Sequence, residues 1–214
     1  MQFAMEELIE AFENKSGIKA EMILSSSGKL TAQIQAGAPY DLFFSADSKY
    51  PEKLASSQLT NAPVVYAYGQ LVEWQKPQGK KELYAMANPK TAPYGKATED
   101  YLEATGRALP DVVYGESISQ VNQFLLSGTV DAGFTSYSSV KSKKFSSAGE
   151  WILIPDSLHQ PIAQAYVVVS KSKKKSEAEA FAQFISSVEA KDILRAYGYR
   201  VNWLYCIILT QHLE

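Results

Sequence analysis

Three polar segments of this chain each follow an apolar run and precede a stretch with helical periodicity. They are residues 25–29 (SSSGK), residues 88–95 (NPKTAPYG) and residues 114–120 (YGESISQ). The first turn of a helix has main-chain N–H groups without partners and lies at the positive end of the helix dipole. Serine hydroxyls add further donors at such a turn. Together the three segments could bind a small anion without any charged side chain.

Each segment also has a simpler interpretation. Serine is a preferred N-cap residue, and Ser117 and Gln120 have the spacing of a capping box. The same pattern nevertheless occurs three times, and none of the segments brings an obvious catalytic residue with it. This recurrence favours anion binding over helix capping alone.

The order and spacing of several sequence blocks resemble those of the periplasmic molybdate-binding proteins of ABC transporters, which are type II periplasmic binding proteins. The likeness extends from Gln2 to Tyr199, and its blocks are SSGKL, GAPYDLFFSAD, ANPKTAPYGKA, YGESISQVNQF, DAGFT, PIAQ and RAYGY. The resemblance implies a receptor that holds a tetrahedral oxyanion, molybdate or tungstate, between two lobes by hydroxyls and main-chain amides. It implies no cofactor and no cation site.

The resemblance assigns the ligand contacts to a small set of positions. The expected positions are Ser26, Ser27 and Ala46 in the first lobe, and Tyr94, Ile118 and Ser136 in the second. Among these, Ser27 is expected to supply a hydroxyl, and Tyr94 and Ile118 to supply main-chain amides. Ser136 stands where some family members have a tyrosine hydroxyl, and Tyr137 follows it directly.

The resemblance also implies a periplasmic location, a monomer, and a membrane permease as partner. No signal peptide is visible, because Met1 leads directly into an amphipathic helix. Family members begin with a strand whose last residue is a ligand, and this chain starts one residue too late to include it. We therefore expect a chain truncated at its N-terminus, with the first strand missing.

The C-terminal end departs from the family pattern as well. Residues 201–209 form an apolar, β-prone run that is too short for a membrane span, which needs about 20 residues. The segment from 202 to 214 could be an artefactual tail, a strand that fills the empty place in the sheet, or an exposed segment that pairs two copies. The single cysteine, Cys206, lies in this tail and excludes an internal disulfide.

Composition and the remaining polar residues exclude or disfavour other classes of function. A net charge of −2 argues against nucleic acid as a partner. His159 and His212 are not placed with other residues as a catalytic triad, so an enzyme is the less favoured class, and His159 is expected in a solvent-facing loop. Asp41 and Asp47 are expected to brace loops rather than bind a metal. Sulfate, phosphate or a small organic anion remain alternative ligands, and a truncated form that has lost binding remains an alternative state.

Strands and helices alternate along the chain, which predicts an α/β fold with largely parallel sheets and a ligand cleft between two lobes. The expected lobes are residues 1–66 with 163–214, and residues 67–162. Helices are expected over residues 3–15, 28–36, 51–57, 94–104, 118–126, 176–187 and 189–197. Strands are expected over residues 18–24, 42–44, 64–74, 83–87, 112–114, 131–135, 151–154 and 163–169.

Overall fold

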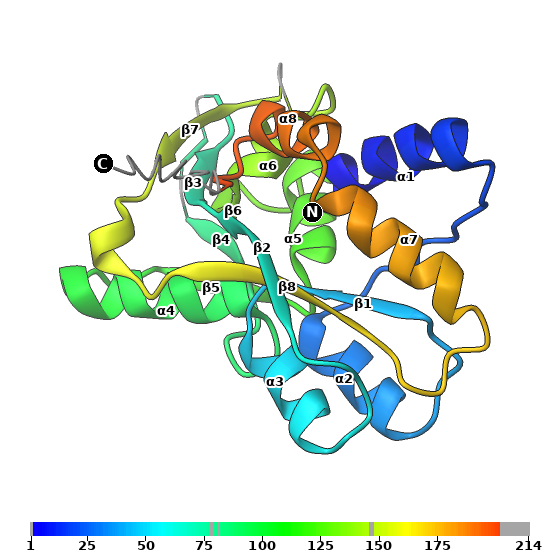
Figure 1. Ribbon diagram of the computed structural model, residues 1–214. Helices are drawn as coiled ribbons and strands as arrows, with labels where there is room; N and C mark the ends of the chain where they lie inside the picture. Colours follow the sequence, from blue (N-terminus) through cyan, green and yellow to red (C-terminus); the bar gives the residue numbers. More distant parts are fainter. Residues whose placement is uncertain (1, 78, 81, 146–147, 202–214) are drawn as a thin grey trace, which may run out of the picture.

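The computed structural model describes residues 2–77, 79–80, 82–145 and 148–201, and these residues form two β-sheets covered by helices (Figure 1). One sheet has three strands in the order β1-β8-β2, and the other has five in the order β5-β4-β6-β3-β7. This arrangement confirms the predicted α/β class. The helices are α1 (Gln2–Ser16), α2 (Ser27–Gln35), α3 (Lys49–Ser56), α4 (Pro93–Thr105), α5 (Ile118–Ser127), α6 (Tyr137–Val140), η1 (Asp156–Leu158), α7 (Lys175–Ile185) and α8 (Val188–Ala196). The strands are β1 (Leu42–Ser45), β2 (Val64–Gly69), β3 (Leu71–Gln75), β4 (Leu83–Ala87), β5 (Asp111–Gly115), β6 (Ala132–Ser136), β7 (Glu150–Leu153) and β8 (Ile162–Val168).

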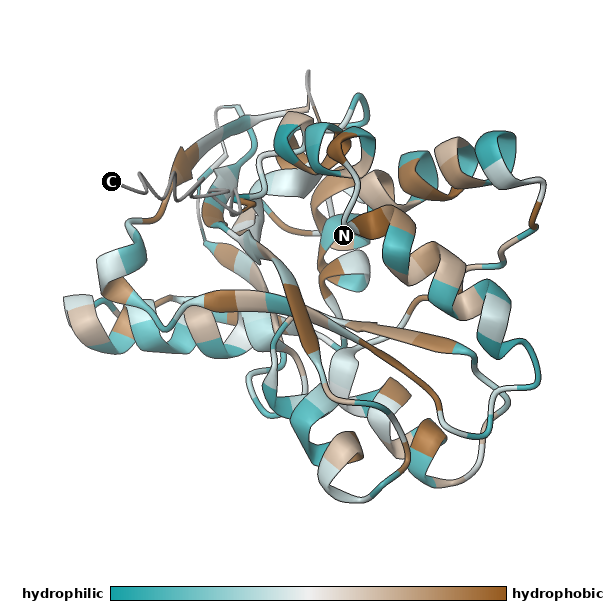
Figure 2. Cartoon of the chain, viewed as in Figure 1, coloured by the Kyte–Doolittle hydropathy of each residue, from teal (hydrophilic) through white to brown (hydrophobic). Residues whose placement is uncertain are grey.

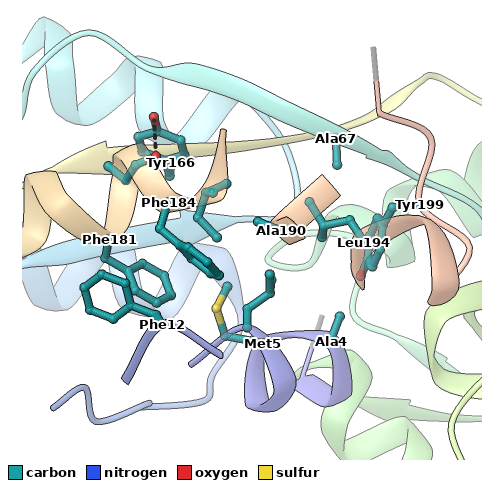
Figure 3. Close-up of a cluster of buried hydrophobic side chains, with 13 residues drawn as sticks. Ala4, Met5, Phe12, Ala67, Tyr166, Phe181, Phe184, Ala190, Leu194 and Tyr199 are labelled. Carbon is teal, nitrogen blue, oxygen red and sulfur yellow. Dashed lines mark hydrogen bonds between the residues drawn. The ribbon is translucent and has the colours of Figure 1, made fainter. Parts of the chain in front are cut away.

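The three-stranded sheet buries both of its faces because successive residues of a strand point to opposite sides. Phe43 of β1 packs toward α2 and α3, whereas its neighbour Phe44 packs toward α1, α7 and α8. On that second face, the ring of Phe12 meets the ring of Phe181 edge-on at 4.9 Å between centroids, within the cluster drawn in Figure 3. Consecutive apolar residues of β1 are therefore buried on opposite faces of the sheet.

The five-stranded sheet is covered in the same two-sided way. Tyr84 and Phe134 face α4, and Ala85 and Val72 face α5 and α6. In Figure 2, β1 and β2 are largely hydrophobic, while hydrophilic and hydrophobic residues alternate around the helices. Such helices bury one stripe against a sheet and leave the other stripe to solvent.

Parallel pairing is confined to one side of the five-stranded sheet. Strand β4 pairs in parallel with β5 and β6, whereas β3 pairs antiparallel with β6 and β7. In the three-stranded sheet, β1 and β2 both run antiparallel to β8. The prediction of parallel sheets is thus corrected for this smaller sheet. The reason is that β8 lies between β1 and β2 and enters this sheet from the larger one in the direction opposite to both of them.

The expected strand over residues 18–24 is absent, which is a second correction. None of the described residues forms a β-ladder with this segment, although Ala20 donates its N–H to the carboxylate of Glu13. Ile23 is 54% exposed and Leu24 is 45% exposed. An apolar β-prone run becomes a strand only where a neighbouring edge pairs with it, and none of the described strands pairs with this run.

Over the described residues, the chain passes between the two sheets at two crossings. The expected single strand over residues 64–74 is interrupted at Gln70, where β2 ends and β3 begins in the other sheet. The return crossing lies between β7 and β8. The chain thus changes sheet at Gln70 and again between β7 and β8. The division into lobes of residues 1–66 with 163–214 and of residues 67–162 stays a prediction. The expectations for residues 202–214 lie outside the described residues.

His159 does not lie in a solvent-facing loop, contrary to the expectation. Its side chain is 8% exposed, and its Nδ1 lies 2.8 Å from the carbonyl oxygen of Gln160. The short helix η1 packs on α4 and turns this residue inward. The expectation is wrong because residues 156–158 form a helical turn against α4 in place of an open loop.

Candidate anion-binding site

A cavity of about 780 Å³ is lined by residues from the helices and strands of both sheets. One end of it is polar and lies at the N-terminal ends of α2, α4 and α5. Five of the six positions expected to bind the ligand line this cavity, namely Ser26, Ser27, Ala46, Tyr94 and Ile118. The cavity then continues between α1, residues 18–24 and β1, where its lining is mostly apolar. The tertiary structure thus brings together segments that are distant in the sequence.

The first helix terminus places two buried serines side by side. Ser26 is the N-cap of α2, and its hydroxyl accepts the N–H of Lys29 at 3.3 Å. Ser27 is the first residue of the helix, and its Oγ accepts the N–H of Ala46 at 3.2 Å. The hydroxyl of Ser27 donates its proton to no acceptor among the described residues, so this proton is available for an anion in the cavity. Both serines line the cavity, and they differ in the N–H that each accepts: Ser26 caps its own helix, whereas Ser27 binds the main chain at Ala46.

The main chain at Ala46 is fixed from two directions. Its N–H donates to Ser27, and its carbonyl oxygen accepts from Nε2 of Gln164 at 3.3 Å. Gln164 lies on β8 and is buried. Ala46 therefore lies beside Ser27, as expected, and in this structure its amide positions the Ser27 hydroxyl.

The second and third helix termini face the same cavity. Pro93 begins α4, so that Tyr94 lies in the first turn, and Ser117 caps α5 just before Ile118. The hydroxyl of Ser117 accepts the N–H of Gln120 at 3.3 Å, as expected for a capping box, and Oε1 of Gln120 accepts the N–H of Glu116 at 2.7 Å. Within the described chain, the N–H groups of Tyr94 and Ile118 have no acceptor. Each helix therefore presents at least one free amide at its positive end.

Among the described residues, those that line the polar end of the cavity at the starts of α2, α4 and α5 have no charged side chain. The charged residues of the lining belong to α1, α7 and the segments next to them, and they are Glu13, Lys19, Glu21, Asp41, Lys174 and Glu177. An arginine in the neighbourhood of α4, Arg107, is engaged elsewhere, since its guanidinium donates to both carboxylate oxygens of Glu73 at 2.7 and 2.8 Å. The positive potential at this end therefore comes from helix termini and oriented N–H groups. Such a set of donors suits an anion of fixed size that accepts several hydrogen bonds.

Ser136, the sixth expected position, is not part of the cavity lining. It is fully buried at the end of β6, and its hydroxyl lies 2.7 Å from that of Ser139 and 2.9 Å from that of Ser138. Ser139 itself does line the cavity. The predicted residue thus lies one hydrogen bond behind a serine that reaches the site.

Asn122 lines the cavity although the sequence analysis did not select it. Its Nδ2 donates to Ser139 at 2.9 Å, and its Oδ1 accepts from the hydroxyl of Thr135 at 2.6 Å. The sequence contained a signal for this residue. Asn122 follows Val121 and Ile118 on the apolar face of α5, and a buried amide on such a face needs polar partners.

Three buried tyrosines lie near the inner wall of the cavity. Burial raises the pKa of Tyr66 and Tyr94 well above 10, and burial raises the pKa of Tyr199 to about 12. The hydroxyl of Tyr199 lies 2.9 Å from that of Ser138. These phenols therefore remain protonated at neutral pH and contribute no negative charge beside an anion.

These shifts predict a loss of stability in alkali. A phenol in the unfolded chain ionises near pH 10, whereas Tyr199 in the folded chain keeps its proton to about pH 12. Above pH 10 the unfolded state binds fewer protons than the folded state, so the free energy of unfolding falls as pH rises. We expect urea midpoints to be constant between pH 8 and 9 and to fall between pH 10 and 12. A constant midpoint up to pH 12 would contradict the burial of these phenols.

Two further structural findings bear on the class of protein. Among the described residues, no group of three or more His, Cys, Asp or Glu side chains is arranged to hold a metal ion. In the same part of the chain, every helix is too short or too polar to cross a membrane.

The chain belongs to the family of bacterial extracellular solute-binding proteins, because the model of that family matches residues 1–200. It is similar to the molybdate-binding protein ModA of Azotobacter vinelandii, with 33% identity over 213 residues that cover 91% of this chain and 84% of the relative. It is also similar to ModA of Rhodobacter capsulatus, with 32% identity over 204 residues that cover 88% of this chain and 80% of the relative.

A solved structure shows the same fold. The periplasmic molybdate-binding protein of Azotobacter vinelandii superimposes with a TM-score of 0.87 and 29% identity, covering 94% of this chain and 96% of that chain. The relatives are solute-binding proteins by name, and the type II periplasmic-binding-protein fold expected from the sequence is confirmed.

Proposed function

We propose that this chain is the solute receptor of an ABC importer and that it binds molybdate or tungstate in the cavity between its two sheets. The observation that carries the proposal is the convergence of three helix N-termini on one cavity, with the free Ser27 hydroxyl among them. The relatives named as molybdate-binding proteins support it.

The donors at the polar end favour an oxyanion that carries no proton. The amides of Tyr94 and Ile118 can only donate hydrogen bonds, and the Ser27 hydroxyl has its proton to donate because its oxygen already accepts from Ala46. A hydrogen bond to a charged group contributes about 1.5 to 3 kcal/mol. Several such bonds can replace the water shell of a dianion, while neutral donors at fixed positions discriminate by size and protonation state.

The same proposal includes the partners and the setting of the protein. A membrane permease would receive the anion from the closed receptor in the periplasm, as expected for a solute-binding protein of an importer. The chain would act without a cofactor and without catalysing a reaction. The periplasmic description of a structurally similar protein supports this location.

A thermal-shift titration with molybdate, tungstate, sulfate and phosphate at equal concentration tests the proposal. A ligand present at 100 times its Kd adds about 2.7 kcal/mol to the free energy of unfolding. For a chain of this size, we expect the Tm to rise by about 5 to 10 °C with molybdate and tungstate. Sulfate and phosphate should leave it nearly unchanged. A flat response to all four anions, or a larger rise with sulfate or phosphate, would refute the proposed ligand.

A further inference from the structure

Three contacts join the two halves of the cavity wall on one side of its polar end. The N–H of Gly28 donates to the carbonyl oxygen of Thr91 at 3.2 Å, and the hydroxyl of Tyr50 donates to the carbonyl oxygen of Lys90 at 3.4 Å. The third contact is an ion pair between Lys29 and Glu116. Gly28, Lys29 and Tyr50 belong to α2 and α3 on the three-stranded sheet. Their partners lie in turns that precede α4 and α5 on the five-stranded sheet.

We propose that these three contacts form a clasp that holds the two halves closed over the cavity and sets the rate at which a bound anion leaves. The clasp rests on the proposed function, because it acts on the same cavity. The clasp residues contact the opposite half of the cavity wall, and none of them has a hydrogen bond to the hydroxyl of Ser27.

The turn on the five-stranded side is held rigid for this role. Oδ1 of Asn88 accepts the N–H of Lys90 at 3.0 Å, and the carbonyl oxygen of Asn88 accepts the N–H groups of Thr91 and Ala92 at 3.2 and 2.9 Å. The N–H groups of Lys90, Thr91 and Ala92 are therefore used within the turn, and the N–H of Asn88 donates to the carbonyl oxygen of Gly115 at 2.8 Å. Its carbonyl oxygens at Lys90 and Thr91 are left to accept from α2 and α3.

The close packing around Gly28, and not its backbone conformation, favours glycine at this position of the clasp. A Cβ atom at this position would lie 3.0 Å from the hydroxyl oxygen of Tyr50 and 3.1 Å from the carbonyl oxygen of Thr91. Its φ is not in the left-handed region that favours glycine. An alanine would therefore fit α2 itself and would press only on the opposing turn and on Tyr50.

The ion pair lies at the outer edge of the clasp. The side chains of Lys29 and Glu116 are 52% and 58% exposed. Lys29 lies in the first turn of α2, where Ser26 accepts its N–H, and Glu116 is held through its own N–H by Gln120. Exposed pairs of this kind are weak and are screened by salt. Their contribution to closure should therefore decrease as ionic strength rises.

The first experiment compares Gly28→Ala with the wild-type chain. Without anion, its Tm should change little, because the better helix propensity of alanine offsets the crowding against Tyr50 and Thr91. In a chase of bound molybdenum-99 molybdate by unlabelled molybdate, the dissociation rate should increase about fivefold. The variant Lys29→Gln should increase it about twofold at low salt and have no effect at high salt. Lys96→Gln is the matched control, because its partners Glu99 and Asp100 lie on the same helix.

A second readout needs no anion, so failure of the clasp and failure of the proposed function can be told apart. In the double variant Tyr50→Phe with Lys29→Gln, hydrogen exchange of the Gly28 amide should be at least fivefold faster, while exchange in β4 and β8 stays unchanged. An unchanged Gly28 amide would overturn the clasp even if molybdate binds. Absence of molybdate binding by the wild-type chain would overturn the function and would leave this exchange result intact.

Discussion

Replacing Ser27 by alanine should lower the affinity for molybdate at least tenfold without unfolding the protein. The substitution removes a hydroxyl whose proton is free to bind an anion and whose oxygen accepts the N–H of Ala46. A hydrogen bond to a charged ligand is worth about 1.5 to 3 kcal/mol, and about 1.4 kcal/mol corresponds to a factor of ten in Kd. Isothermal titration calorimetry with molybdate measures the change.

The control is Ser187→Ala, which removes a serine of the same structural kind outside the cavity. Ser187 is the N-cap of α8, and its hydroxyl accepts the N–H of Ala190 at 3.2 Å. Its loss should reduce stability by about 1 kcal/mol and leave molybdate affinity unchanged. Equal affinities for Ser27→Ala and the wild-type chain would remove Ser27 from the binding site, whatever the control shows.

Replacing Arg107 by methionine should destabilise the fold by about 3 to 5 kcal/mol, because it removes the guanidinium that pairs with the buried carboxylate of Glu73. Glu73 is 4% exposed on β3, and its oxygens accept from Arg107 and, at 2.9 Å, from the hydroxyl of Tyr84. Burial raises the pKa of Tyr84 to about 12, and its hydrogen bond to Glu73 adds to this shift. Urea denaturation measures the loss of stability.

Two further variants separate the buried charge from a general effect of losing a cation. Adding Glu73→Gln to Arg107→Met should restore part of the lost stability, because a neutral amide is cheaper to bury than a carboxylate that has lost the Arg107 guanidinium. Lys96→Met breaks an exposed ion pair with Glu99 and should cost less than about 1 kcal/mol. If Arg107→Met were no more destabilising than Lys96→Met, the Glu73 carboxylate would not depend on Arg107.

Neither Arg107→Met nor its rescue variant should change molybdate affinity in folded protein. Arg107 lies beyond the C-terminal end of α4, whereas the cavity lies at the N-terminal end of that helix. The Arg107 substitution should therefore change stability at constant affinity. The Ser27 substitution should change affinity and lower stability only by about 1 kcal/mol, because the N–H of Ala46 loses its hydroxyl acceptor.

The sequence by itself predicted the local elements of the site. Ser26 and Ser117 were recognisable as helix caps, and Pro93 marked the start of α4, because these residue types satisfy or tolerate the free N–H groups of a first helical turn. The expected helix over residues 118–126 likewise ends close to Gly128, the left-handed residue that caps α5 in the structure. Such signals depend on neighbours within four residues, so they can be read without the fold.

The tertiary structure decided whether residues 18–24 form a strand and which side chains meet at the cavity. Residues 18–24 have the composition of a strand, but strand formation depends on an adjacent edge that the local sequence does not reveal. Ser27 and Ala46 are 19 residues apart, and only folding places the amide of one on the hydroxyl of the other. Ser136 and Ser139 differ by one helical turn, and the packing of α6 turns Ser139 toward the cavity and Ser136 away from it. Long-range pairing and side-chain direction follow from packing between segments, which no short sequence pattern contains.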